Sequence, residues 1–166
     1  MPRLRYVIAV LAGGILVAGL LSGTAPATPG TGITTTNLVR ATIARRIHLN
    51  VRVAQDQHIR IHTDAPVDIV DVKVELEPGG TTGWHSHPGP SFNAVAEGEV
   101  TYYKAESSSC APNRYPAGTT FIDTGQVVHT LRNEGAVPAV LYVTWLVPAG
   151  ANPIRIDQPS PGNCPF

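Results

Sequence analysis

The sequence predicts an all-β protein in which one barrel or sandwich domain follows an N-terminal signal segment. Two observations lead to this class. The 166 residues include 16 glycines and 15 prolines, the residues that separate many short strands by turns. Several segments also alternate apolar and polar side chains, as strands with one buried face do. With 43% hydrophobic and 14% charged residues, a chain of this length can bury a core and is not wholly disordered.

Residues 1–27 have the pattern of a secretory signal peptide. Arg3 and Arg5 precede an uncharged apolar run over residues 6–21, and Ala25 and Ala27 occupy the positions that a signal peptidase reads. Cleavage after Ala27 is expected, which would make the mature protein secreted or extracytoplasmic in the cell envelope. The alternative is an uncleaved membrane anchor, but the run is shorter than the roughly 20 residues that a spanning helix needs.

Residues 28–37 are expected to be a flexible leader. They are rich in threonine, glycine and proline and carry no charge, and such a segment buries too little apolar surface to offset the entropy lost on ordering. The domain is therefore predicted to begin near Leu38 and to form a β-barrel over residues 38–147.

The clearest strand of this domain covers residues 70–76. Its even positions are valine or leucine and its odd positions are charged, which gives one buried face and one wet face. Weaker patterns predict further strands over residues 47–53, 57–62, 91–96, 99–104, 119–122, 127–131 and 139–147. Turn residues between most of these segments keep the connections short, which favours antiparallel pairing.

The chain contains two cysteines, Cys110 and Cys164. In an oxidising compartment such a pair most simply forms a disulfide. The bridge would pin residues 148–166, a proline-rich segment that is otherwise expected to be an irregular C-terminal tail. The alternative is two unrelated thiols, and a metal or redox role is disfavoured because no CxxC pairing is present.

The charge balance excludes one class of partner. Lysine and arginine number 12 and aspartate and glutamate number 12, so the formal net charge is zero. Loss of Arg3 and Arg5 with the signal would leave a mildly acidic mature protein. A chain without a basic field is not expected to bind nucleic acid. Membrane contact is expected only through the N-terminal segment, if it stays uncleaved.

Three histidines have the arrangement of metal ligands. His85 and His87 are two positions apart in a segment expected to be extended, so both imidazoles project from one side. His129 lies on another predicted strand and shares a face with the apolar Val127 and Leu131, which directs it into the barrel. Three converging neutral imidazoles suit Zn, Fe, Cu, Ni or Mn. A His-x-His pair by itself is more often not a metal site, so the surrounding residues must show whether this pair binds a metal.

Those surrounding residues resemble the first motif of the cupin superfamily. Gly79, His85, His87 and Gly98 stand at the spacing of that motif, and Ser91 occupies the position where the family has glutamate. The family's fold is the double-stranded β-helix, a jelly-roll barrel. The resemblance therefore implies that the predicted strands form such a barrel.

A second stretch resembles the second cupin motif. Gly118, His129 and Asn133 match its spacing, whereas the inner proline is absent and Gly125 lies one place early. The two motifs together make the barrel the expected architecture of the domain.

The resemblance implies that His85, His87 and His129 bind a divalent transition metal, whether Fe, Mn, Zn, Ni or Cu. The fourth ligand of the family is replaced by Ser91, and because a short protonated hydroxyl is a poor ligand, coordination positions would be left for water or substrate. Three neutral ligands leave the charge of the ion uncompensated, which favours an anionic or chelating guest. By strand parity Asn93 shares the inward face with Ser91 and would contact that guest or a bound water; the alternative is an exposed or turn asparagine.

Other polar residues give weaker signals. His58, Arg60 and His62 share one face of a predicted strand, which more often indicates a solvated face than a second metal site. Trp84 should point away from the histidine that follows it and pack in the barrel wall or at an interface. Asp123 precedes a turn and is expected to cap it.

Two functions follow from the resemblance. The first is an exported metal-dependent enzyme, oxygenase-like or acting through Lewis-acid chemistry on a small molecule. The alternative is a noncatalytic module that binds a metal or small ligand. A closer similarity, over residues 83–90 and 161–166, is to small exported bacterial single-domain cupins without an assigned reaction. No general base is identified, because the usual glutamate is missing, and a homodimer is implied by the resemblance alone.

Overall fold

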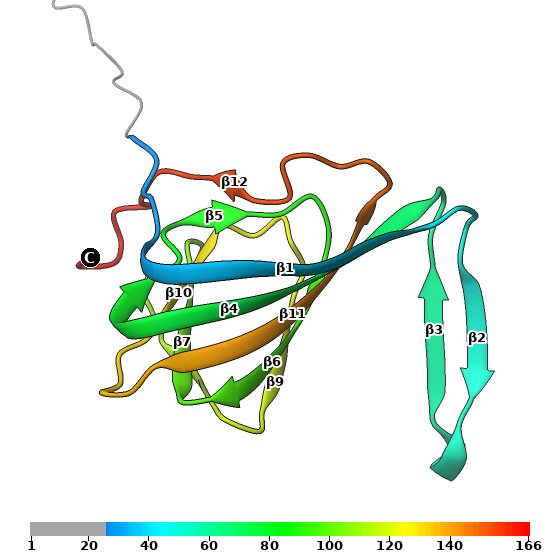
Figure 1. Ribbon diagram of the computed structural model, residues 1–166, viewed down its shortest axis with the longest axis horizontal. Coiled ribbons are helices and arrows are strands. Elements are labelled where there is room, and N and C mark those ends of the chain that lie inside the picture. Colours follow the sequence, from blue (N-terminus) through cyan, green and yellow to red (C-terminus); the bar gives the residue numbers. More distant parts are fainter. Residues whose placement is uncertain (1–25) are drawn as a thin grey trace, which may run out of the picture.

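Twelve β-strands and one 3-10 turn, η1 (Ala54–Asp56), make up the regular structure of residues 26–166, the part of the chain that the computed structural model describes (Figure 1). In chain order the strands are β1 (Thr31–Ile43), β2 (His48–Arg52), β3 (His58–His62), β4 (Val67–Thr81), β5 (His85–Ser86), β6 (Ser91–Glu97), β7 (Glu99–Lys104), β8 (Asn113–Pro116), β9 (Thr120–Asp123), β10 (His129–Arg132), β11 (Ala139–Pro148) and β12 (Ile156–Asp157). The all-β prediction is confirmed. Nearly all of the predicted signal peptide, residues 1–27, lies outside the described range.

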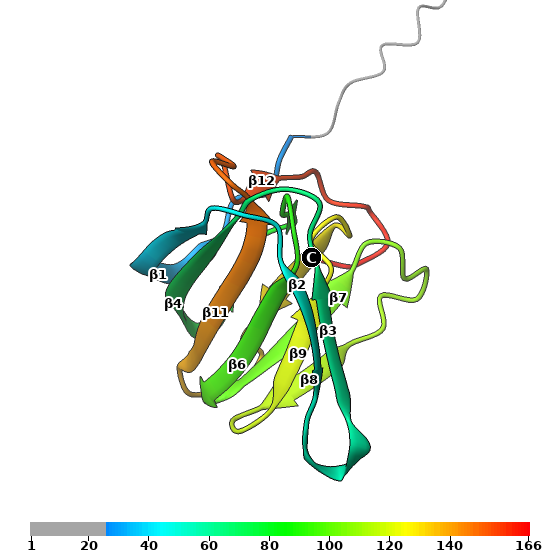
Figure 2. The ribbon, with the colours of Figure 1, turned by 90° about the vertical axis from the view of Figure 1, so that its right-hand side faces the viewer.

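Ten of these strands form a jelly-roll barrel from two groups of antiparallel neighbours (Figure 2). The first group has the order β1-β4-β11-β6-β9, and the second has the order β12-β5-β10-β7-β8. A bridge between Arg132 of β10 and Thr81 of β4 joins the two groups along one side. Within the described range no helix is long and apolar enough to cross a membrane.

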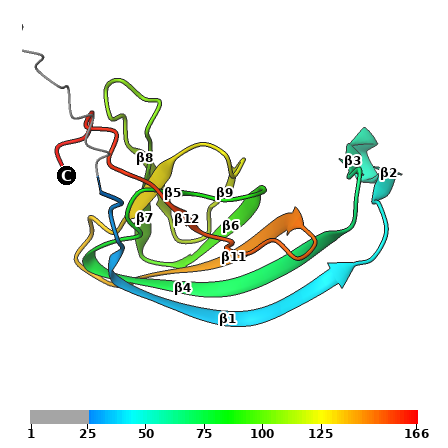
Figure 3. The same ribbon diagram turned by 90° about the horizontal axis from the view of Figure 1, so that it is seen from above.

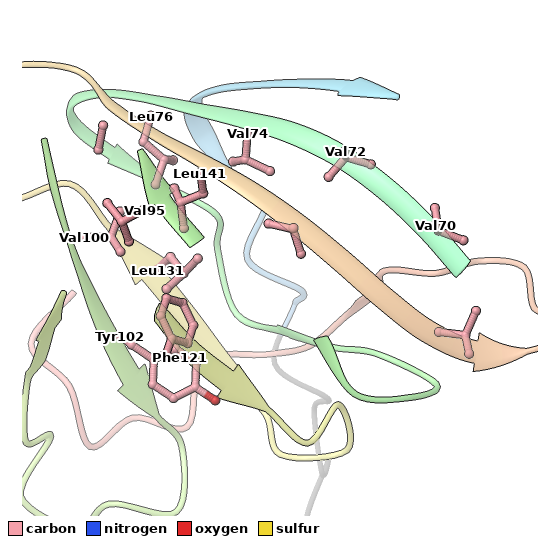
Figure 4. Close-up of a cluster of buried hydrophobic side chains, with 13 residues drawn as sticks. Val70, Val72, Val74, Leu76, Val95, Val100, Tyr102, Phe121, Leu131 and Leu141 are labelled. Atoms are coloured by element: carbon pink, nitrogen blue, oxygen red, sulfur yellow. The ribbon is translucent and has the colours of Figure 1, made fainter. Parts of the chain in front are cut away.

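The barrel interior contains one main hydrophobic core. On β4 the alternation seen in the sequence places Val70, Val72, Val74 and Leu76 inside, and all four are buried. Figure 4 shows them with side chains from the other strands that fill the space between the two groups. The largest of those partners are Leu141, Tyr102, Phe121 and Leu131. Complementary apolar faces therefore hold the barrel closed.

The predicted flexible leader over residues 28–37 was wrong, because most of it belongs to β1. This strand pairs with β4 along nearly its full length, from Thr31 opposite Thr81 to Ile43 opposite Val67. The segment carries β-branched threonines, which suit strands, and it covers an edge of β4 that would otherwise expose unpaired backbone groups. The C-terminal half of β1 is also held by the buried carboxylate of Asp68, which accepts a hydrogen bond from Arg40 at 2.6 Å.

The predicted barrel over residues 38–147 also includes a hairpin that lies outside it. β2 and β3 pair only with each other and project away from the barrel (Figure 1). One face of the hairpin carries Leu49, Val51 and Ile59, which are all exposed. The other carries the polar set that the sequence assigned to a solvated face, and its members His58, Arg60 and His62 are all exposed.

The C-terminal tail is irregular apart from β12 and is held by a disulfide. Cys110 and Cys164 are bonded, with their Cα atoms 5.2 Å apart, as predicted. Beneath this tail Trp84 is 2% exposed and packs with Tyr103 and Cys164 in a second small cluster, and Phe166 stacks on its ring at 6.4 Å. Trp84 therefore packs in the barrel wall, which was one of the two roles expected for it.

Candidate metal centre

Three histidine side chains converge inside the barrel. His85 lies on β5, His87 follows that strand directly, and His129 begins β10 opposite His85 in the register. Their ring centroids are 4.4 to 5.3 Å apart, and all three residues are buried. One ring nitrogen from each can be chosen so that the three lie within 4.8 Å of one another. The predicted convergence of these imidazoles is confirmed.

Backbone carbonyls determine which nitrogen of each ring carries the proton. The Nδ1 atom of His85 lies 2.8 Å from the carbonyl oxygen of Gly83, that of His87 lies 2.9 Å from Ile154, and that of His129 lies 2.8 Å from Val127. A carbonyl oxygen only accepts, so each Nδ1 must be the donor. Each Nε2 is then a free acceptor, as in metal-binding histidines whose other nitrogen is held by an outer partner.

The surroundings also keep these rings neutral. Burial removes water that would stabilise the charged imidazolium form, and this is the largest cause of the lowered pKa values. The pKa of His87 falls to about 4, and that of His85 falls well below 6.5. The same burial lowers the pKa of His129, although the nearby carboxylate of Asp123 opposes the effect. A neutral imidazole with a free Nε2 is the form that binds a metal. The three donors therefore fit a divalent transition metal.

Two glycines allow the chain to place His87. The backbone N–H of His87 donates to the carbonyl of Gly125 at 2.7 Å. Gly125 has φ of +91°, and a Cβ atom there would collide with the carbonyl of Gly89. Glycine at this position is thus required both by the left-handed backbone and by the close approach of the two loops.

Next to the histidines lies a cavity of about 250 Å³, which His87 and His129 line. Ser91 and Asn93 of β6 also line it, and both are buried. Asn93 Nδ2 donates to Ser91 Oγ at 2.9 Å. The inward position expected for Asn93 by strand parity is confirmed, and its alternative as an exposed or turn residue is wrong.

Asp123 belongs to this cavity, so its predicted role as a turn cap was wrong. The residue is 2% exposed, and its Oδ1 accepts a hydrogen bond from the Tyr102 hydroxyl at 3.1 Å. Its Oδ2 lies 3.7 Å from His129 Nδ1 and has no hydrogen-bond partner within residues 26–166. The sequence contained the signal, since Phe121 and Asp123 alternate with polar or exposed positions, but the predicted strand stopped one residue too early.

Sequence reasoning also missed two donors on the cavity wall. Trp145 of β11 and Arg155 of the tail both line the cavity. Trp145 Nε1 and Arg155 Nη2 are buried nitrogens without a hydrogen-bond partner in the described part of the chain. Arg155 had no recognisable pattern around it, because the fold of the tail, rather than a strand period, brings it to the site.

Comparisons with known proteins agree with this architecture. Residues 72–145 match the cupin domain family. Among solved structures, the chain is similar to the polyketide cyclase RemF from Streptomyces resistomycificus, with a TM-score of 0.52 and 14% identity over 78% of this chain and 73% of that one. A search of curated proteins found no match.

Two further structures resemble the chain more loosely. An uncharacterized protein with a double-stranded β-helix domain from Klebsiella pneumoniae subsp. pneumoniae MGH 78578 has a TM-score of 0.45 and 21% identity, over 70% of this chain and 86% of that one. An oxalate oxidase in complex with the substrate analogue glycolate has a TM-score of 0.46 and 23% identity, over 81% of this chain and 61% of that one.

Proposed function

Because residues 72–145 match the cupin domain family, we propose that the chain is a cupin and a metal-dependent enzyme acting on a small molecule in its barrel. His85, His87 and His129 would hold the ion. The observation that carries the proposal is that all three Nδ1 atoms are occupied by backbone carbonyls, which leaves three neutral Nε2 atoms for one ion. When bound, a divalent transition metal would polarise a substrate oxygen as a Lewis acid or, if it is iron, activate dioxygen.

Ser91 is central to how the substrate would reach the ion. Its hydroxyl already accepts a hydrogen bond from Asn93 at 2.9 Å, and it stands where the family supplies an anionic ligand. The site therefore offers three protein ligands, the number typical of catalytic centres that keep a position for substrate. Asn93 would hold the Ser91 hydroxyl in place on the cavity wall through this hydrogen bond.

The carboxylate of Asp123 supplies the proton acceptor that an enzyme mechanism needs. Its unpartnered Oδ2 lies in the cavity wall beside His129, where it can accept a hydrogen bond or a proton from a bound substrate. Tyr102 orients the carboxylate by donating to Oδ1. This carboxylate favours Lewis-acid chemistry with proton transfer over oxygenation, and it favours an enzyme over the alternative of a noncatalytic binding module.

The test begins with the metal content of protein purified from its native compartment. The protein is then stripped, reloaded with Fe(II), Mn(II) or Zn(II), and incubated with small hydroxy acids, diketones and phenols. Mass spectrometry follows products, and an electrode follows oxygen. An enzyme forms a product only when loaded, whereas saturable capture without any product would support the binding module. Oxygen consumption coupled to product would instead support dioxygenase-type chemistry.

We infer that the protein works outside the cytoplasm, with residues 1–27 removed on export. The disulfide between Cys110 and Cys164 supports an oxidising compartment. Mass spectrometry of the mature protein should find Thr28 at its N-terminus, and a retained Met1 would support the membrane anchor instead. A homodimer also remains a prediction, and light scattering of the purified protein measures it.

A further inference from the structure

Arg155 occupies a special position in the tail, between two segments that hold the histidines. The residue before it, Ile154, accepts the hydrogen bond from His87 Nδ1. The strand that follows, β12, pairs with β5 so that Asp157 lies opposite His85 (Figure 3). The backbone on both sides of Arg155 is therefore fixed against the metal centre, and the side chain is delivered to the cavity wall.

The guanidinium nitrogens of Arg155 lie in two different environments. Its Nε donates to Asp157 Oδ1 at 2.6 Å, on the outer side of the tail. Its Nη2 is buried, and no acceptor for it exists among residues 26–166. An arginine that served only the ion pair would leave its remaining nitrogens in water. A buried donor of a charged group is costly unless something accepts its hydrogen bond, so an acceptor from outside the described chain is expected.

A second donor lines the same cavity. Trp145 Nε1 is likewise buried without an acceptor in the described residues, and its ring lies 5.2 Å from that of His87. Much of the remaining wall is apolar and is formed by side chains such as Phe121, Leu131 and Val143. The polar residues of the wall other than these two donors include Ser91, Asn93 and Asp123. A positive donor and a neutral donor beside an apolar part of the wall match an anionic oxygen group attached to a small carbon body.

We propose that this cavity recognises a small carboxylate, with Arg155 Nη2 and Trp145 Nε1 as the donors that bind its oxygens. The inference rests on the proposed function, because it takes the cavity beside His87 and His129 to be the substrate site. A volume of about 250 Å³ lies near the lower end of the roughly 300–1,000 Å³ typical of ligand pockets, which favours a small acid. A hydroxyl on that acid would find its acceptor in Asp123 Oδ2.

Lactate and lactamide provide a matched pair of probes, since they have nearly the same shape and differ in charge. The chain has two tryptophans, so the Trp145→Phe variant identifies the indole N–H resonance of Trp145 in ¹⁵N-labelled protein. Titration of the metal-free, disulfide-bonded protein should shift this resonance with lactate at concentrations at least about tenfold lower than with lactamide. Repeating the titration with one equivalent of Zn(II) shows whether the preference persists in the loaded protein.

Arg155→Gln should remove the preference for the charged probe. Its lactate affinity should fall by about 10- to 100-fold toward that of lactamide, while its lactamide affinity stays the same. A variant whose tail had merely loosened would bind both probes more weakly and would keep their ratio. Arg60→Gln on the exposed hairpin should match the wild type. Trp145→Phe has no indole resonance at this position, so its titration is followed by the backbone amide resonances of the cavity strands, and it should lose about tenfold in lactate affinity.

Equal affinity of the wild type for lactate and lactamide would overturn the proposal, and so would a lactate preference that survives in Arg155→Gln. Failure of the protein to take up any metal would overturn the proposed function instead. Because the titration is measured without metal, that failure leaves the result for Arg155 intact.

Discussion

His129 on β10 lies directly opposite His85 on β5, and their ring centroids are 4.4 Å apart. The two strands are 44 positions apart in the chain, yet a backbone pairing fixes the relative position of the rings. The third ring, of His87, is held by the tail through Ile154. The strand pair β5–β10 and the C-terminal segment are therefore both needed to assemble the three-histidine centre. His129, on the strand pair, and His87, held by the C-terminal segment, are tested separately below.

The first prediction concerns the histidine set. His129→Ala removes one of three neutral donors, so we expect metal affinity to fall by more than the roughly 10- to 100-fold that loss of an outer partner costs. Metal stoichiometry after dialysis, measured by elemental analysis, checks this for Zn(II). His62→Ala is the matched control, because this exposed ring belongs to the hairpin. Equal metal content in the two variants would exclude the proposed ligand set.

The second prediction concerns the stability of the metal-free protein in acid. Burial lowers the pKa of His87 from 6.5 to about 4, so the folded form resists a proton that the unfolded chain accepts. Below pH 6.5 the unfolded state therefore binds more protons, and stability falls until the pH reaches about 4. Above pH 6.5 this histidine contributes no pH dependence. The full effect of His87 is on the order of 3 kcal/mol.

Urea unfolding at pH 7.5, 6.5, 5.5 and 5.0 measures this dependence. His87→Asn cannot take up the proton, and its amide nitrogen can still donate toward Ile154, so its stability should fall less steeply than that of the wild type. The exposed His48 supplies the control, since His48→Asn should follow the wild-type curve. A wild-type slope in His87→Asn would contradict the prediction.

The third prediction concerns the disulfide. Cys110 and Cys164 are separated by 54 positions, and closing a loop of this length stabilises the fold by up to about 4 kcal/mol through the entropy of the unfolded chain. The Cys110→Ser, Cys164→Ser double variant should lose a comparable free energy of unfolding in urea. The wild type with reduced and alkylated thiols should show the same loss. An unchanged unfolding midpoint in both would show that the bridge contributes no stability.

The architecture and the three histidines could be predicted from sequence because both depend on local patterns. A period of two identified β4, and the same period placed His85 and His87 on one side. β1 was missed because its threonine-rich segment has no apolar alternation, and it becomes a strand by covering the free edge of β4. β12 consists of two residues, too few for a period of two to be recognised, and β5, which also has two, was expected only as an extended segment around His85 and His87.

Arg155 and Asp123 were missed for different reasons. Arg155 lies in a segment without regular alternation, and it reaches the cavity because β12 pairs with β5 and the disulfide holds the tail. Asp123 continues the inward parity of Phe121, but a charged residue before a turn is usually exposed. A buried carboxylate with an unpartnered oxygen destabilises the fold and is found mainly where a functional site uses it. Its burial can be recognised only from the folded structure.

The last prediction tests the role of that carboxylate. Asp123→Asn keeps the size of the side chain and an oxygen for the Tyr102 hydroxyl, which donates to Oδ1 at 3.1 Å, but removes the group that can accept a proton. We expect kcat for the substrate found by screening to fall by about 100-fold or more, with metal stoichiometry unchanged because the ring nitrogen nearest Asp123 is Nδ1 of His129. Tyr102→Phe removes only the orienting hydroxyl and should cost less. Full turnover in Asp123→Asn would assign proton transfer to another group, whereas loss of metal and turnover together would make Asp123 a support for His129 rather than a participant in the chemistry.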